Sequence, residues 1–175
     1  MTSHPAPHGP HGSLMEADRT RRRPGSAEPA GREATRRGLA LVRAYARGDS
    51  ATIAAALDTT DPAVRTQLPS VTRDVLRLVV GCVLSGPRTL TPADVVRTAA
   101  RIAAAGPPRH EPGTVRAVRA WASRDDAVLR TSWQDEAAGA HGRAVLAAAL
   151  AVAAWGEAPF LHLLAAFDEL TGARG

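Results

Sequence analysis

The sequence predicts an all-α fold, a compact bundle of about six to eight helices that follows a disordered N-terminal tail. Beyond residue 33 the apolar residues recur at helical spacing, and no segment shows the apolar–polar alternation of a β-strand. Proline, glycine and capping residues separate these helical segments from one another. These patterns divide the chain into a tail, residues 1–33, and a helical domain, residues 34–175.

The tail is predicted from its composition. Residues 1–33 hold five of the 13 prolines, four glycines and three of the six histidines. Of the 34 Leu, Ile, Val and Phe residues only Leu14 lies there, so the tail has almost nothing to bury. The other 33 suffice for a core in residues 34–175. That core is expected to be shallow, because Ala occupies 37 positions of the chain.

The domain is expected to begin with a helix over residues 34–47 and a short second helix. Gly48 can take the left-handed conformation that ends a helix. Asp49 or Ser50 can then cap the second helix, which is expected to end at Leu57.

Asp61 fits the N-cap and Pro62 the first position of a short helical turn. Pro69 is expected to end this turn. The most apolar helix follows over residues 71–84. Because its apolar residues cover almost every side, we expect it at the centre of the bundle. Cys82, the only cysteine, lies in this helix and is expected to be buried, and a single cysteine excludes an intramolecular disulfide.

The rest of the chain is expected to form further helices. Thr91 and Pro92 fit a capping box that opens a helix to Ala105, and a proline-rich linker to Gly113 follows. The later helices are expected over residues 114–121, after a second capping box at residues 123–126, over residues 143–155 and over residues 159–171.

The two halves of the domain resemble each other. Residues 42–51 and 118–127 are identical at six of ten positions, and Tyr45 aligns with Trp121. Both halves also place an apolar helix and a proline-started helix after this segment. A duplication with halves at 34–106 and 114–172 is one interpretation; the alternative is that an Ala-, Arg- and Val-rich chain matches itself by chance.

No catalytic or cofactor-binding signature is present, and no cofactor is expected. The sequence lacks a phosphate-binding glycine loop, a nucleophile elbow and a pair of histidines on one helix face. His162 is expected within the last helix, at the boundary of its apolar face. His110 and His141 are expected in solvated linkers.

The cations are all arginine: the chain has 22 Lys+Arg residues, none of them lysine, and a net charge of +5. Absent Lys and Asn with abundant Ala, Arg, Gly and Pro are typical of a GC-rich genome such as those of actinobacteria. The tail arginines, Arg19, Arg21, Arg22 and Arg23, could contact nucleic-acid phosphates. No aromatic residue near them could stack on bases, so a solvated tail is the alternative.

The N-terminus suggests one metal site. If the initiator methionine is removed, the free amine, two amides and His4 form a nitrogen set that suits Cu(II) or Ni(II), with His8 and His11 as additional ligands. A histidine that falls at this position by chance is the alternative.

The function that the sequence favours is that of a small helical interaction or regulatory protein. A protein partner or a second copy is expected, with Trp133 and Trp155 as partner-contact residues because each lies next to a polar break. We expect a cytoplasmic location without membrane contact, since no secretory signal is seen and the apolar run 144–155 is too short to span a bilayer. Two alternatives remain open: a nucleic-acid-associated protein that uses the tail, and an enzyme with a pocket between helices.

Overall fold

The computed structural model describes residues 24–87, 89–133 and 136–172. Within them the chain is entirely helical, with no strand, as the sequence predicts. The eight α-helices and one 3₁₀ turn are α1 (Pro24–Arg47), α2 (Ser50–Leu57), α3 (Pro62–Leu84), α4 (Pro92–Ala103), η1 (Pro108–His110), α5 (Glu111–Ser123), α6 (Asp126–Ser132), α7 (Glu136–Trp155) and α8 (Glu157–Gly172).

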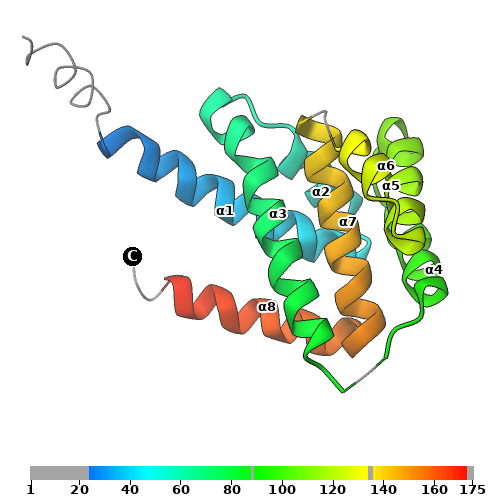
Figure 1. Ribbon diagram of the computed structural model, residues 1–175. Helices are drawn as coiled ribbons and strands as arrows, with labels where there is room; N and C mark the ends of the chain where they lie inside the picture. Colours follow the sequence, from blue (N-terminus) through cyan, green and yellow to red (C-terminus); the bar gives the residue numbers. More distant parts are fainter. Residues whose placement is uncertain (1–23, 88, 134–135, 173–175) are drawn as a thin grey trace, which may run out of the picture.

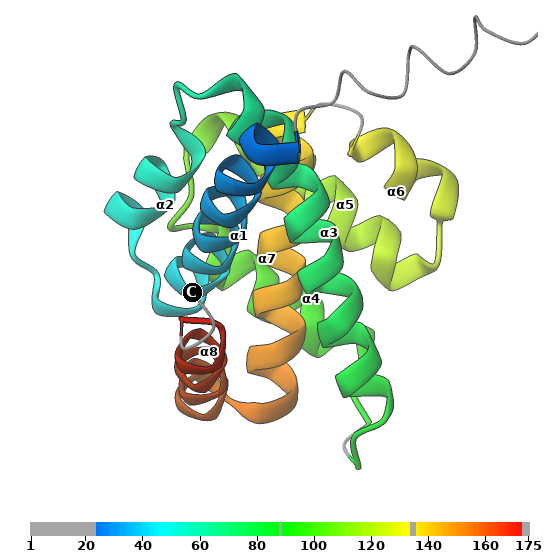
Figure 2. The same ribbon diagram turned by 90° about the vertical axis from the view of Figure 1, so that its left-hand side faces the viewer.

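The helices surround a central pair, α3 and α7, which run side by side through the molecule (Figure 1). Helix α1 packs on α3 and α7, and α4 packs on α7 and α5. The two short helices are peripheral, α2 against α1 and α6 against α5. Helix α8 lies at one end of the bundle, where it contacts α1 and α7 (Figure 2).

Helix α7 forms the middle of the core. Its residues from Ala144 to Leu150 are all buried, and four of these seven residues are alanine. Alanine leaves room for neighbouring backbones to approach, so α1, α3, α4 and α5 can all pack on this one helix.

Residues 71–84 of α3 belong to the central pair, but they are not buried on every side. Leu78 is 59% exposed and Cys82 is also exposed. The expectation of a buried Cys82 is therefore wrong. One face of this apolar segment has no helix packed closely against it in the described part of the chain.

The first helix begins at Pro24, ten residues earlier than predicted, so residues 24–33 are helical. Ala30 and Ala34 pack against Val64 of α3, which gives this turn a buried face. Glu33 accepts hydrogen bonds from Arg36 and Arg37 at 2.7 Å, and these bonds lower the pKa of Glu33 to about 2. Composition alone missed this extension because its buried residues are alanines.

Helix α3 continues through Pro69, where the sequence predicts an end. Its buried residues, Val64, Leu68, Thr72, Leu76 and Val79, form one stripe that crosses the proline without a break. A proline inside a helix costs about 3 kcal/mol. The stripe packs on α1 and α7, and Arg143 of α7 donates a hydrogen bond to the Pro69 carbonyl at 3.4 Å. Tertiary packing therefore outweighs the local preference.

The two similar segments of the sequence have the same backbone geometry. Gly48 and Arg124 both adopt positive φ, 70° and 58°. The residue that follows each, Asp49 or Asp125, donates its backbone N–H five residues back, at 2.9 and 2.8 Å. The carboxylates of both aspartates then cap the next helix, where they accept from the backbone N–H three residues on, at 3.0 Å in each half. The N-cap of α6 is thus Asp125 and not Ser123, with which the predicted box at 123–126 begins.

One helix has the length and composition to cross a membrane. This is α7, whose apolar window, Ala137–Trp155, has 19 residues and a mean hydropathy of 1.4. The helix starts earlier than the predicted run of 12 residues, which did not reach a spanning length. Since 72% of the window is buried within the described bundle, its placement is that of a core helix.

Candidate functional site

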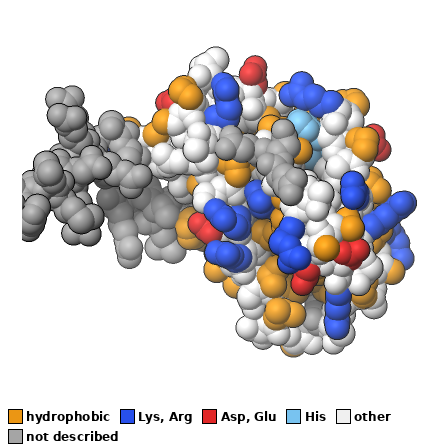
Figure 3. Space-filling model, turned by 45° about the horizontal axis from the view of Figure 1, so that its top comes forward, with side chains coloured by type: hydrophobic (Ala, Val, Ile, Leu, Met, Phe, Trp, Pro, Cys, Tyr) orange, Lys and Arg blue, Asp and Glu red, His pale blue; other side chains and the backbone are white. Residues whose placement is uncertain are grey.

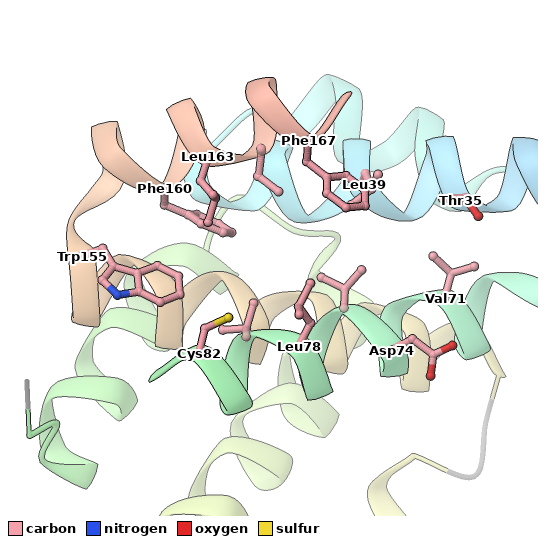
Figure 4. A pocket seen from close by; sticks show the side chains of 13 residues that line it. Thr35, Leu39, Val71, Asp74, Leu78, Cys82, Trp155, Phe160, Leu163 and Phe167 are labelled. Atoms are coloured by element: carbon pink, nitrogen blue, oxygen red, sulfur yellow. The ribbon is translucent and has the colours of Figure 1, made fainter. Parts of the chain in front are cut away.

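A groove of about 390 Å³ lies between α1, α3 and α8 (Figure 4). Its walls are almost entirely hydrocarbon. We call this the α8 groove, and its lining residues are Thr35, Leu39, Val71, Asp74, Val75, Leu78, Val79, Cys82, Trp155, Phe160, Leu163, Leu164 and Phe167. The volume falls within the range of about 300–1,000 Å³ that is typical of binding pockets.

The two facing walls follow from helical spacing. On α3 the lining residues step by three or four positions along one face, and on α8 Phe160, Leu164 and Phe167 do the same. Both helices thus turn an apolar stripe toward the space between them. Phe160 and Leu164 are buried, whereas Leu163 is 52% and Phe167 40% exposed. The outer part of α8 therefore leaves large apolar side chains in contact with solvent.

The charge in the groove is confined to one end. Figure 4 shows Asp74 beside Val71, across from Thr35, while Cys82 and Trp155 lie at the opposite end. Asp74 pairs with Arg77 at 3.7 Å, and both side chains are largely exposed, so the pair is weak. The main favourable contribution to the binding free energy in this groove is therefore the removal of apolar surface from water.

Helix α8 is held at its start and less firmly beyond it. A single residue, Gly156, connects it to α7, and its φ of +88° favours glycine. Arg43 of α1 donates to the Leu164 carbonyl at 3.2 Å. Among the described residues, α8 packs on α1 and α7 but scarcely on α3.

The two predicted partner-contact tryptophans lie in different surroundings. Trp155 lines the α8 groove, and its ring lies 6.2 Å from that of Phe160. Trp133 is partly buried, with Arg143 stacked 5.0 Å from its ring centroid. Its Nε1 is buried without a hydrogen-bond partner among the described residues. The structure thus joins only Trp155 to an open apolar surface.

A buried cluster of polar rings could not be foreseen from the sequence. The imidazole of His141 lies on α7, 1% exposed, and its Nδ1 is hydrogen-bonded to the Tyr45 hydroxyl. His110 stacks on His141 with ring centroids 4.9 Å apart. Contrary to expectation, His141 is therefore a core residue and not part of a solvated linker. The neighbouring residues do not predict a buried helical position for His141, because Gly139 and Gly142 on either side are typical of a loop.

Burial decides the protonation of this cluster. Desolvation, with a smaller contribution from the nearby charge of His110, lowers the pKa of His141 to about 4. Burial also raises the pKa of Tyr45. Both groups are neutral near pH 7. With Tyr45 fully buried and His141 almost so, the pair has no surface on which to meet a substrate, and it serves as a polar contact within the core.

The remaining predicted site residues do not join the groove. Arg19, Arg21, Arg22 and Arg23, and also His4, His8 and His11, lie outside the described residues. His162 is exposed on α8 and is not among the groove residues. Within the described part of the chain no three metal-binding side chains come together.

Arginines on the helical body are dispersed. On the face shown in Figure 3, they are spread among carboxylates and hydrophobic side chains and do not form one basic surface. Several are paired within their own helix, such as Arg97 with Asp94 at 3.3 Å. Arg116 and Arg119 line a separate depression of about 360 Å³ between α5 and α6.

No family model matches the chain, and no curated protein or solved structure gives a significant match.

Proposed function

We propose that this protein is a non-catalytic helical interaction protein and that the α8 groove binds the apolar face of an amphipathic helix from a partner protein. The observation that carries the proposal is the unfilled apolar space between α8 and α3. Leu78 on one wall and Leu163 on the other are more than half exposed. Large apolar side chains that converge on one exposed space are typical of interaction sites.

The other half of the molecule supports a helix as the occupant. In chain order, α4 and α8 are the fourth helices of the two halves, and α3 and α7 are the third. Helix α4 packs directly on α7, and its buried residues include Val95, Ala99 and Ile102, which are spaced by four and three residues. On the hypothesis that the two halves are duplicated, the place on α3 that corresponds to the α4 site on α7 is the α8 groove. A helix with a similar face would therefore cover α3 as α4 covers α7.

A synthetic peptide with the sequence of residues 91–105, labelled with a fluorophore, provides a defined probe of the groove. Its fluorescence anisotropy is measured as the full-length protein is titrated in. We expect saturable binding that Leu78→Asp weakens by about ten-fold or more, because a carboxylate in the wall would be desolvated by the bound helix.

Leu84→Asp is the matched control. Leu84 is on the same helix and 81% exposed but lies outside the groove, so its substitution should leave binding unchanged. Equal loss in both variants, or no binding by the wild type, would overturn the proposal. Self-association in sedimentation velocity that Leu78→Asp abolishes would instead assign the groove to a second copy of the chain.

A further inference from the structure

We propose that α8 is an autoinhibitory helix: it closes onto α3 and occupies the same apolar surface that a partner helix would use. The inference rests on the function proposed above, because it concerns control of access to the same groove. The structure shows the open arrangement, with α8 packed on α1 and α7 and separated from α3 by the groove.

The closed arrangement has a template in the same molecule. Helix α4 lies directly on α7, and its buried residues Val95, Ala99 and Ile102 are of modest size. On α8, Phe160, Leu164 and Phe167 have the same spacing; the first two are already buried in the core, and Phe167 is 40% exposed. The two helices thus have matching stripes, but α4 lies directly on α7, whereas the groove separates α8 from α3.

The different positions of α4 and α8 follow from the lengths of the segments that precede these helices. Seven residues, 85–91, join α3 to α4, whereas Gly156 alone joins α7 to α8. A one-residue connection restricts where α8 can start, and Phe160, which is 1% exposed, anchors that start in the core. Beyond Phe160, the Arg43 bond to the Leu164 carbonyl reaches α8 from α1, on the side of the groove away from α3. A tilt of α8 about this anchored start brings its outer turns toward α3, at the expense of the Arg43 bond.

Closure has a driving force in the side chains that the open form exposes. Leu78, Leu163 and Phe167 are 59%, 52% and 40% exposed, and all three line the groove. Movement of α8 onto α3 would remove these side chains from water together. A partner helix would remove the same surfaces, so closure and partner binding exclude each other.

The only cysteine of the chain allows this closure to be trapped. Figure 4 shows Cys82 projecting from α3 toward α8, below Phe160 and Leu163. In the full-length Leu163→Cys variant, glutathione disulfide can oxidise the two thiols to an intramolecular disulfide and is itself reduced to two glutathione molecules. A disulfide requires the two Cβ atoms to come within about 3.5–4.5 Å, so its formation reports the approach of α8 to α3.

We expect rapid disulfide formation in Leu163→Cys, seen as a mobility shift on non-reducing gels. The saturating 91–105 peptide should slow it at least several-fold, and the oxidised protein should lose peptide binding until it is reduced. Ala165→Cys is the control, because Ala165 is exposed on α8 and does not line the groove. That variant should form the disulfide slowly, and at the same rate with or without peptide.

The outcomes separate this inference from the proposed function. If the wild type binds the peptide but disulfide formation in Leu163→Cys is slow or unaffected by peptide, α8 does not compete and the inference is overturned. If the disulfide forms readily but the reduced protein binds no peptide, the partner-helix function fails while closure stands. Should Leu163→Cys fail to fold by circular dichroism, the pair Leu78→Cys and Phe167→Cys in a Cys82→Ser background answers the same question.

Discussion

Arg124 holds the left-handed backbone conformation that Gly48 holds at the equivalent place in the first half, with φ values of 58° and 70°. Each residue ends a long helix one position before the aspartate that caps the next short helix. Glycine adopts this conformation without a steric penalty, whereas a residue with a Cβ pays roughly 1–2 kcal/mol. The second half therefore carries strain that the first half avoids.

Arg124→Gly should raise the free energy of unfolding by about 0.5–1 kcal/mol, since relief of the steric penalty exceeds the added entropy of the unfolded chain. Gly48→Ala should lower it by about 1 kcal/mol, and nothing lies within 4 Å of the added Cβ to confuse the comparison. Urea denaturation followed by circular dichroism measures both. Stabilisation by Gly48→Ala would contradict the expected left-handed geometry.

The buried imidazole predicts a loss of stability in acid. The pKa of His141 is about 4 in the folded protein, against an ordinary value of 6.5 for the unfolded chain, so between these values the unfolded chain binds the extra proton. Stability should be complete above pH 6.5 and should fall as the pH drops toward 4, by about 3 kcal/mol in total. Urea midpoints measured across this range, at constant ionic strength, test it.

Two variants identify the histidine that is responsible. His162→Gln changes an exposed residue of α8 and should leave the pH dependence intact. His141→Gln should flatten the dependence between pH 6.5 and 4, although it should also lower stability at neutral pH. A wild-type slope retained in His141→Gln would show that another group causes the acid effect.

Gly106 is required by the rings that it faces. A Cβ at this position would lie 2.8 Å from Cε1 of His141 and 2.9 Å from the Tyr45 hydroxyl oxygen. Gly106→Ala should therefore destabilise the protein by about 1–3 kcal/mol, as overpacking of a core does. Gly113→Ala on α5 is its matched control: with nothing within 4 Å, it should be neutral or stabilise by up to about 1 kcal/mol. Thermal unfolding ranks the two.

Gly38 sets the spacing between α1 and α3. A Cβ there would approach Cγ1 of Val71 to 2.6 Å, and a β-branched side chain cannot readily rotate away. Gly38→Ala should destabilise by about 1–3 kcal/mol, and addition of Val71→Ala should recover part of that loss. Gly81→Ala on α3, where nothing lies within 4 Å, should stabilise slightly. If Gly38→Ala also stabilises, the close packing of α1 on α3 is refuted.

The sequence predicts the helix starts correctly where a side chain caps the first turn. Asp49, Asp61 and Thr91 each accept a backbone N–H bond at the position where the sequence places an N-cap. The failures occur where distant contacts decide. Pro69 remains inside a helix because its stripe is buried on two neighbours, and α1 extends back to Pro24 because two alanines pack on α3.

The candidate site could be predicted only in part. The polar break after Trp155 predicts a contact surface there; the structure places Trp155 in the groove wall, and its contact with a partner stays a prediction. Cys82 was expected inside the core from its apolar neighbours, yet it is exposed. Cys82 lines the groove that separates α8 from α3, and the apolar sequence of residues 79–84 gives no sign of this groove. His141 was missed because its partner, Tyr45, lies 96 positions earlier in the chain.

The pairing of α3 with α7 has a consequence for how the chain unfolds. Each half supplies one member of this pair, which is the most extensive interface in the described bundle, and α4 of the first half is seated on the second. Neither half thus encloses a core of its own. The two should unfold in a single calorimetric transition, with calorimetric and van't Hoff enthalpies in agreement, and fragments cut between residues 106 and 114 should acquire stable helical structure only when they are mixed.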